Sequence, residues 1–283
     1  MNILVKPVRD IELYDKADGF VLPLLDFSVD YRNYYTLEDI ISIRAKTNKK
    51  IFVVMNKMIE NDEVESVKNK LLELDKIGIE GIFFYDLAIL ELKKELGIRI
   101  ELVWNNTHMV TNYYTCNYYY YSEGVKYAYL SNEITFDDIV TIKNKSKCSL
   151  IFMLLGYPVV SFSKRKLVSN SGFKDNIIIN EEKSKQKYMV FEDKNGTTFK
   201  YNKIRNNSIC LKELINNNLD YVYLIEDDID HDKFMNGLNL TSEFINKQIE
   251  EKKYVTNMKK LFGGDTGFLY RKTIYKVTKK WKE

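Results

Sequence analysis

The order of apolar and polar residues along the chain predicts alternating strands and helices. Short continuous apolar runs are typical of strands that are covered on both faces, as in a parallel sheet. Such runs occupy residues 19–24, 50–55, 80–85, 99–104, 125–130, 149–154 and 219–225. Segments with apolar residues at helical spacing lie between them, at 36–46, 62–76, 88–95, 109–121 and 135–145. The chain therefore reads as a series of βα units.

An internal similarity supports a repeated architecture. Residues 36–55 align without gaps with residues 135–154. Each copy begins with Thr and has Asp three residues later, a spacing close to that of a capping box at a helix start. In both copies an amphipathic helix is followed by an apolar strand. Two similar helix–strand units indicate a repeating βα fold.

Six predicted strands in series, followed by a later strand at 219–225, favour an α/β fold of the TIM-type (β/α) barrel, whether regularly or irregularly closed. A doubly wound open sheet is the alternative. Barrels of this length commonly form one domain, so we expect a single domain over residues 1–283.

The βα pattern breaks after the sixth predicted strand. Residues 159–187 are polar, and residues 188–201 alternate around Asn195-Gly196, which predicts an inserted β-hairpin. We treat this hairpin as an excursion from the barrel rather than a second domain. Near the end of the chain, a short strand starting at Gly267 is predicted to lead into a basic tail at 274–283.

Composition narrows the class of protein. Hydrophobic residues at 45% and charged residues at 29% are ordinary for a globular protein. The formal net charge of +3 permits contact with nucleic acid without forming a concentrated basic patch. The first residues soon turn charged and no apolar run approaches about 18 residues, so we expect neither a signal peptide nor a membrane span. An abundance of Asn, Lys, Ile and Tyr suggests a low-GC, bacterial genome.

The cysteines point to a reducing compartment. Cys116, Cys148 and Cys210 are odd in number and widely spaced, which argues against a disulfide framework. We therefore expect a cytoplasmic protein.

Polar residues follow the predicted strands, and in a barrel they would share one rim. They are Asp26, Asn56, Asp86, Asn105 to His108, Asn132, Glu133 and the acidic group Glu226-Asp227-Asp228. Helix caps and turns account for many such Asn and Asp residues. His108 stands out as a general acid/base or a ligand, paired with Glu133 or Asp86 from neighbouring strands. A structural hydrogen bond is the alternative for His108.

Other sequence patterns give weaker evidence for a functional site. EDDIDHD (226–232) resembles the start of a calcium loop, but counted from Asp228 it has Lys233 where Gly is needed and Asn239 where Glu is needed. We therefore predict a solvated strand end leading into a helix. The tyrosines of 113–121 could stack on bases, with packing as the alternative. The chain contains no HExxH, GxSxG or CxxC and no recognisable nucleophile–base pair.

Several passages together resemble the collagenase-like peptidases of family U32. The passages, in chain order, are FSVDYRNYYTLEDI (27–40), KKIFVVMNKMIENDE (49–63), GIEGIFFYDLAIL (78–90), the run Thr107, Met109 and Asn112, LSNEIT (130–135), LLGYP (154–158) and GFLYRKT (267–273). Asn56 stands at a recurrent Asn of the family and Asp86 at its Asp. The order and spacing of these passages make the resemblance fairly specific.

The resemblance implies a barrel-type fold and a family named for peptidases. It also implies relatives that act in hydroxylating RNA bases or ubiquinone precursors, several with an iron–sulfur cluster. This chain departs from the family pattern, with His108 in place of Gln and Asn132 in place of Arg. Residues 156–175, where cluster-bearing relatives place cysteines, contain none, and the three cysteines present cannot complete a four-thiolate site. We therefore do not expect an iron–sulfur cluster in this chain.

Three functional hypotheses follow from the resemblance. In the first, the protein is a peptidase in which His108 is the base and Glu133 and Asp86 orient it or hold a metal. In the second, it is a tRNA base-hydroxylation factor, an idea supported by the basic tail and the Tyr-rich segment. In the third, it is a cluster-free partner of a longer family member. The expected substrate is a peptide or an RNA, and the expected substrate-binding residues are Asn56, Thr107, Asn112 and Asn132.

Overall fold

The structure is a computed structural model that describes residues 1–106, 108–174, 176–182 and 185–271. Within these residues, eight parallel strands form a closed barrel. They are β1 (Asn2–Lys6), β2 (Gly19–Pro23), β3 (Lys50–Met55), β4 (Gly81–Phe84), β5 (Glu101–Trp104), β6 (Tyr127–Tyr129), β7 (Ser149–Gly156) and β13 (Tyr221–Ile225). Neighbours pair in that order, and β13 closes the ring by pairing with β1. The predicted TIM-type barrel is confirmed, and the open-sheet alternative is wrong.

The sequence pattern missed one barrel strand. Strand β1 lies between β2 and β13 and pairs in parallel with both. It has only five residues at the very start of the chain, so it presents no helix-to-strand rhythm from which it could be read. Its last residue, Lys6, is fully buried although charged.

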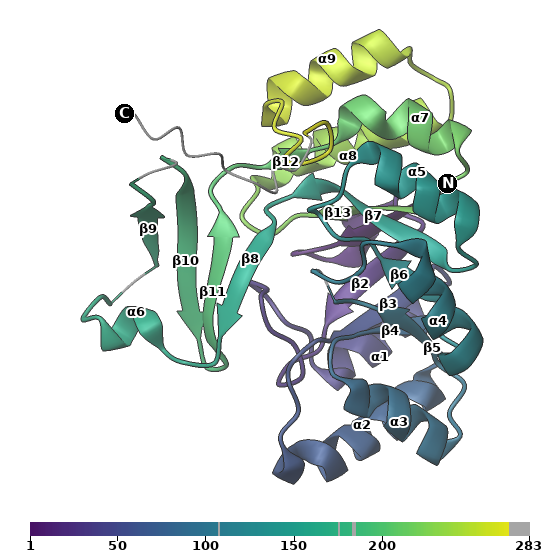
Figure 1. The fold of residues 1–283 in the computed structure, drawn as a ribbon, viewed down its shortest axis with the longest axis vertical. Coiled ribbons are helices and arrows are strands. Elements are labelled where there is room, and N and C mark those ends of the chain that lie inside the picture. Colours follow the sequence, from purple (N-terminus) through teal and green to yellow (C-terminus); the bar gives the residue numbers. More distant parts are fainter. Residues whose placement is uncertain (107, 175, 183–184, 272–283) are drawn as a thin grey trace, which may run out of the picture.

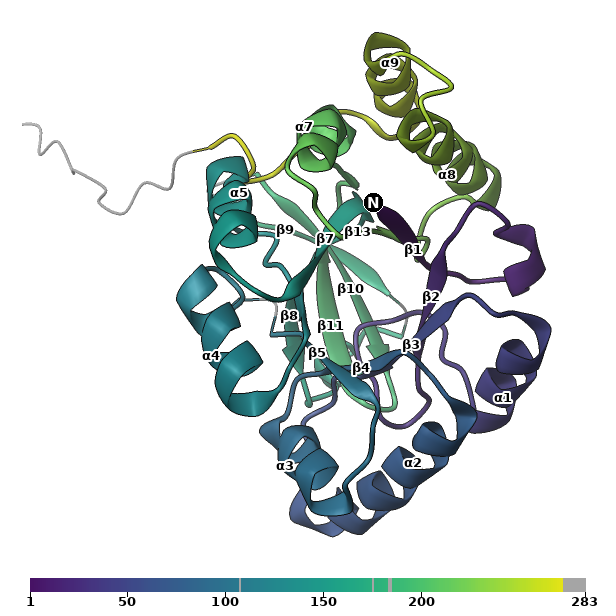
Figure 2. The same cartoon turned by 90° about the vertical axis from the view of Figure 1, so that its right-hand side faces the viewer.

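Helices surround the barrel, as the view along its axis shows (Figure 2). They are α1 (Leu37–Lys46), α2 (Val64–Ile77), α3 (Leu87–Leu96), α4 (Tyr113–Glu123), α5 (Phe136–Lys145), α7 (Leu211–Asn216), α8 (His231–Ile245) and α9 (Glu251–Phe262). Thr36 and Asp39 form a capping box at the start of α1, and Thr135 and Asp138 form one at the start of α5. The structure thus confirms the helix starts that the internal similarity predicted.

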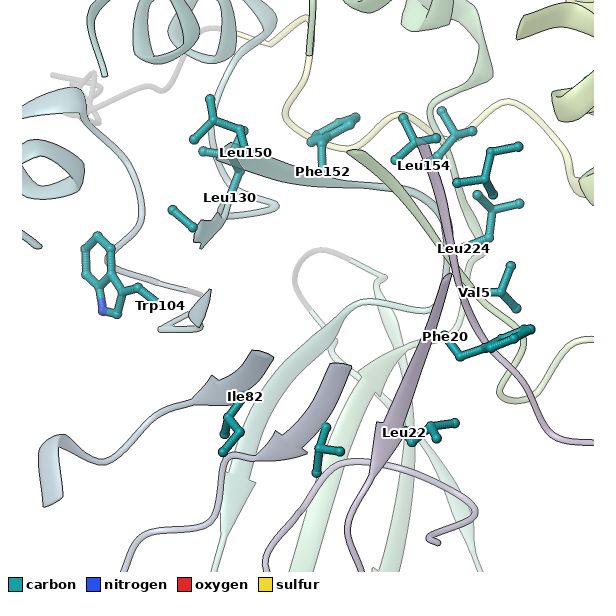
Figure 3. Close-up of a cluster of buried hydrophobic side chains, with 14 of the residues drawn as sticks. Val5, Phe20, Leu22, Ile82, Trp104, Leu130, Leu150, Phe152, Leu154 and Leu224 are labelled. Carbon is teal, nitrogen blue, oxygen red and sulfur yellow. The ribbon is translucent and has the colours of Figure 1, made fainter. Parts of the chain in front are cut away.

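The side chains of the barrel strands alternate between two apolar layers. One layer lies between the barrel strands and the helices. Figure 3 labels ten residues of this layer, from Val5 to Leu224, in or directly after strands around the barrel. The other fills the barrel interior and is rich in rings, including Phe52, Phe83, Tyr129 and Tyr223. Because the interior is packed, ligands can approach only its ends. Among the described residues, no helix combines the length and apolar character needed to cross a membrane.

The excursion after β7 is larger than a hairpin. It is a four-stranded antiparallel sheet in the order β8-β11-β10-β9, beside the barrel (Figure 1). Its elements are β8 (Val159–Ser163), α6 (Leu167–Asn170), β9 (Ile177–Asn180), β10 (Lys187–Asp193) and β11 (Gly196–Tyr201). Strands β10 and β11 form the predicted hairpin. The chain then returns through β12 (Arg205–Asn206), which pairs antiparallel with β7.

Two expectations concern the end of the chain. Residues 267–270 form a turn, so the strand predicted to start at Gly267 is wrong. An added Cβ at Gly267 would lie 0.9 Å from Nη1 of Arg205, and its φ of 58° is left-handed, so the chain turns tightly over Arg205 instead of extending. The predicted basic tail at 274–283 lies outside the described residues.

Candidate functional site

A cavity lies at the carboxyl ends of the barrel strands, under the four-stranded sheet. We call it the mouth cavity. It has a volume of about 70 Å³ and is lined by Asp30, Tyr31, Asn56, Asn105, Tyr129, Asn132, Met153, Tyr157, Pro158, Val159, Lys200, Tyr223, Ile225 and Asp227. An outer cavity of about 240 Å³ adjoins it and shares Asp30, Asn56, Asn105 and Val159. This end of a TIM-type barrel is where ligands bind and chemistry occurs.

Two segments far apart in sequence roof the mouth cavity. The loop between β2 and α1 contributes Asp30 and Tyr31, and strand β11 contributes Lys200. Asp30 has a left-handed backbone with φ of 78°, and its carboxylate accepts a hydrogen bond of 3.2 Å from Oγ1 of Thr198 on β11. Asp is one of the few residues besides Gly that tolerate this conformation. The loop and the sheet are therefore joined at the cavity wall.

Further polar contacts hold the sheet against the same loop. The Tyr34 hydroxyl donates to Asp193 at 2.8 Å, and the Asn195 amide donates to the Ser28 carbonyl at 3.2 Å. The guanidinium of Arg32 lies over the ring of Phe191 at 3.9 Å. These contacts hold the two parts of the roof, the loop and the sheet, together.

A buried network of alternating charges forms one wall. Lys6 at the end of β1 is paired with Asp227, which follows β13. Lys200 lies 3.1 Å from Asp228 and 3.9 Å from Asp227, and Arg32 lies 2.7 Å from Asp228. Lys6, Lys200 and Asp227 are at most 2% exposed. Buried charges of this kind persist because each has a partner.

Burial shifts the pKa values of several side chains that line or support this wall. Desolvation raises the pKa of Asp30 to about 7, against the opposing effects of the Thr198 hydrogen bond and the Lys200 charge. Desolvation lowers the pKa of Lys6, although Asp227 partly restores it. Burial also raises the pKa of Tyr31 and Tyr223, so both hydroxyls stay neutral. With a pKa of about 7, Asp30 changes charge near neutral pH.

Two carboxamides on the cavity wall have unmet hydrogen-bonding capacity. The Oδ1 atoms of Asn105 and Asn132 are buried and have no hydrogen-bond partner among the described residues. Asn56, in contrast, exchanges two hydrogen bonds with the backbone of Val29, at 2.9 and 3.3 Å. A buried acceptor without a donor is uncommon in folded proteins, and it marks a place where a ligand could supply the donor.

His108 and Glu133 do come close together at the rim. His108 Nδ1 lies 3.7 Å from Glu133 Oε2, and both side chains are about half exposed, at 53% and 52%. His108 lines the outer cavity but not the mouth cavity. In water at this separation, such a pair interacts weakly.

The other predicted site residues lie in different settings. Asp86 caps α3: one carboxylate oxygen accepts from Ala88 N and the other from Ile59 N, both at 3.0 Å. Asn112 caps α4 by accepting from Thr115 N at 3.0 Å. Asn56 and Asn132 both line the mouth cavity. Thr107 lies outside the described residues.

The acidic group after β13 corrects one interpretation of the sequence. We expected a solvated strand end, but Glu226 is 0% and Asp227 1% exposed. Glu226 accepts hydrogen bonds from Tyr14 and Val8 and lies 2.6 Å from Nδ1 of His231, the first residue of α8. Apart from His231, the partners come from β1, the following loop and β11, so the sequence around 226–232 could not reveal them. A helix does follow, as predicted.

The three cysteines lie in the apolar layer between barrel and helices, not at the mouth. The Sγ of Cys148 lies 3.2 Å from the carbonyl oxygen of Cys116, and Cys210 lies at the start of α7. In the part of the chain that the structure describes, no group of three or more His, Cys, Asp or Glu residues is arranged to hold a metal ion.

Comparison with known proteins identifies the family. The model of peptidase family U32 matches residues 28–220. The tRNA hydroxylation protein P2 of Bacillus subtilis (strain 168) is 28% identical over 224 residues, which are 72% of this chain and 71% of that protein. The solved structure of the U32 peptidase Mk0906 superposes with a TM-score of 0.51 at 14% identity, covering 80% of this chain and 92% of that one, and so shares the fold. The chain belongs to peptidase family U32.

Proposed function

We propose that this protein acts in the hydroxylation of a tRNA base, with the mouth cavity as the site that meets the RNA. The observation that carries the proposal is the similarity to a tRNA hydroxylation protein along most of both chains. That similarity covers 72% of this chain and 71% of the relative. We place this activity in the cytoplasm, where tRNA is modified and where free thiols such as those of this chain persist.

The mouth cavity suits this role better than peptide hydrolysis. Its lining offers carboxamides, tyrosine rings and paired charges, and these groups can hold and read a flat polar molecule. A peptidase needs a nucleophile or activated water within reach of a base, held by further groups. The half-exposed His108 and Glu133 are 3.7 Å apart at the rim, where water screens them.

The test is a comparison of modified nucleosides. Total tRNA from a strain lacking the gene and from its parent is digested and analysed by mass spectrometry. We expect a hydroxylated nucleoside to disappear in the deletion strain and to return with the wild-type gene. An unchanged nucleoside profile would contradict the proposal.

Peptide hydrolysis is the second candidate, and the proximity of His108 to Glu133 is the observation that favours it. The purified protein would be incubated with a peptide library and the products read by mass spectrometry. Cleavage that disappears in His108→Ala would support a peptidase. Cleavage retained in a His108→Ala, Glu133→Ala double variant would exclude this pair as its catalytic residues.

A longer family member could act together with this chain in either reaction. Affinity purification of the tagged protein from its own cells tests this possibility. Stoichiometric recovery of a second U32 protein would support a complex, and recovery of the chain alone would support an independent enzyme.

A further inference from the structure

We infer that the mouth cavity binds a single neutral nucleobase, lifted out of the RNA strand, through the carboxamides of Asn105 and Asn132. The inference rests on the proposed role in tRNA hydroxylation and assigns that role a ligand class and two recognition residues. An enzyme that acts on an atom of a base must bring that base out of its stack into a pocket.

The charges of the wall disfavour an anionic ligand. Asp30, Asp227 and Lys200 are the charged residues that line the mouth cavity. Lys200 is already bound to Asp228 at 3.1 Å, and Asp227 is paired with Lys6. A phosphate or carboxylate would therefore face two acids and a cation whose charge is already balanced. A neutral ligand avoids this repulsion.

The unpaired acceptors call for a ligand with N–H donors. The buried Oδ1 atoms of Asn105 and Asn132 have no hydrogen-bond partner in the part of the chain that the structure describes, and Asn105 as a whole is only 5% exposed. Leaving a buried acceptor unsatisfied costs free energy that a bound donor would recover. Nucleobases present N–H groups beside carbonyl or ring-nitrogen acceptors, the same donor–acceptor edge that Asn and Gln carboxamides recognise in pairs of hydrogen bonds.

The lining rings and the modest size of the space suit one base. Tyr31, Tyr129, Tyr157 and Tyr223 line the cavity, and Tyr129 and Tyr223 pack edge-to-face against each other, with ring centroids 5.7 Å apart, in the barrel interior. Proteins that read unpaired bases stack them on such rings while hydrogen-bonding their edges. The mouth and outer cavities, at about 70 and 240 Å³, are small beside typical pockets for drug-sized ligands, roughly 300 to 1,000 Å³. The outer cavity leaves room for the attached sugar.

The roof adds a group that can adapt to the base. Asp30 faces both cavities and is held by Thr198. In its protonated form it donates a hydrogen bond to a carbonyl of the base, and in its ionised form it accepts one from an N–H. Asp30 thus adds to the two carboxamides a group that can either donate or accept a hydrogen bond.

The test uses ¹⁵N-labelled full-length protein and NMR titration. The probes are uridine, cytidine, adenosine and guanosine, with ribose and inorganic phosphate as controls. The side-chain NH₂ signals of Asn105 and Asn132 are assigned by their loss in Asn105→Ala and Asn132→Ala. We expect at least one nucleoside to shift both signals, while ribose and phosphate leave them in place. Equal shifts with ribose or phosphate, or no shift with any nucleoside, would overturn the inference.

The variants separate a recognition role from a structural one. Asn105→Ala removes an unsatisfied buried acceptor, so its melting temperature should stay unchanged or rise while nucleoside binding weakens at least tenfold. Asn48→Ala, an exposed residue before β3, should change neither property. A lowered melting temperature with unchanged nucleoside binding would show that Asn105 is structural. Nucleoside binding without any change in the tRNA of a deletion strain would refute the proposed function and leave the base site standing.

Discussion

Lys6 donates a buried hydrogen bond to Asp227 and thereby joins the first and last strands of the barrel, β1 and β13. Lys6 also donates to Asn33 in the loop that carries Asp30. One lysine therefore ties together the closure of the barrel and the roof of the mouth cavity.

Removing one member of the Lys6–Asp227 pair should be far worse than removing both. Lys6→Met removes the closest cation of the buried Asp227, leaving only Lys200 at 3.9 Å, and should lower the unfolding free energy by about 3 to 5 kcal/mol. Lys6→Met combined with Asp227→Leu removes both charges and should recover most of that loss. Urea unfolding of the two single variants and the double variant measures the coupling. Additive losses would show that the two residues act independently.

Stability should depend on pH through Asp30. Because burial raises the folded-state pKa of Asp30 to about 7, above its unfolded value near 4, the folded protein holds this proton more tightly. Its contribution to stability is therefore fully present below pH 4 and is lost as the pH rises toward 7. Asp30→Asn should remove this loss, making the variant more stable than wild type at pH 8 by roughly 2 to 4 kcal/mol.

Asn is a suitable replacement because it also tolerates the left-handed backbone at position 30. The measurement is urea unfolding at pH 4, 6 and 8, with Asp62→Asn, an exposed position, as control. An identical pH dependence in Asp30→Asn and wild type would contradict the account of Asp30.

Asp86 should behave as a helix cap rather than a catalytic residue. Its two oxygens accept backbone hydrogen bonds from Ala88 and Ile59. Asp86→Ala should lower the unfolding free energy by about 1 to 2 kcal/mol, while Asp86→Asn should keep most of the capping. Loss of tRNA hydroxylation in Asp86→Asn at unchanged stability would indicate a direct role in the reaction.

Substitutions at His108 should have little effect on stability. Its contact with Glu133 is long and half exposed, so His108→Ala should change the unfolding free energy by less than about 0.5 kcal/mol. Glu133→Gln serves as the matched variant on the other side of the contact. A larger loss in either variant would reveal a buried interaction that the geometry does not contain.

Much of the fold could be predicted from the sequence, because the patterns that specify its strands, helix starts and hairpin lie in short stretches of consecutive residues. The apolar runs of the barrel strands and the Thr–Asp capping boxes of α1 and α5 are written in consecutive residues. The hairpin of β10 and β11 was predicted from Asn195-Gly196 for the same reason. Strand β1 escaped notice because it has only three apolar residues, Ile3 to Val5, which are too few to show a periodicity.

The site could be predicted only in part, because the residues that bury and pair its polar side chains come from distant parts of the chain. Asn56 and Asn132 were expected at the rim and do line the mouth cavity. Asp227 was predicted to be solvated, since its partners Lys6 and Lys200 lie in distant parts of the chain. Asn105 was expected at the rim, but its buried, unpartnered Oδ1 could not be read from sequence. Asp30 looks like an ordinary loop residue in sequence, and only the folded chain brings it against Thr198 of β11.

The most direct measurement is complementation of the deletion strain with cavity variants, read by mass spectrometry of tRNA nucleosides. We expect wild type and Asn48→Ala to restore the hydroxylated nucleoside fully, whereas Asn105→Ala and Asn132→Ala, produced at wild-type levels, should not. Full restoration by both cavity variants would contradict the claim that this protein hydroxylates tRNA through its mouth cavity.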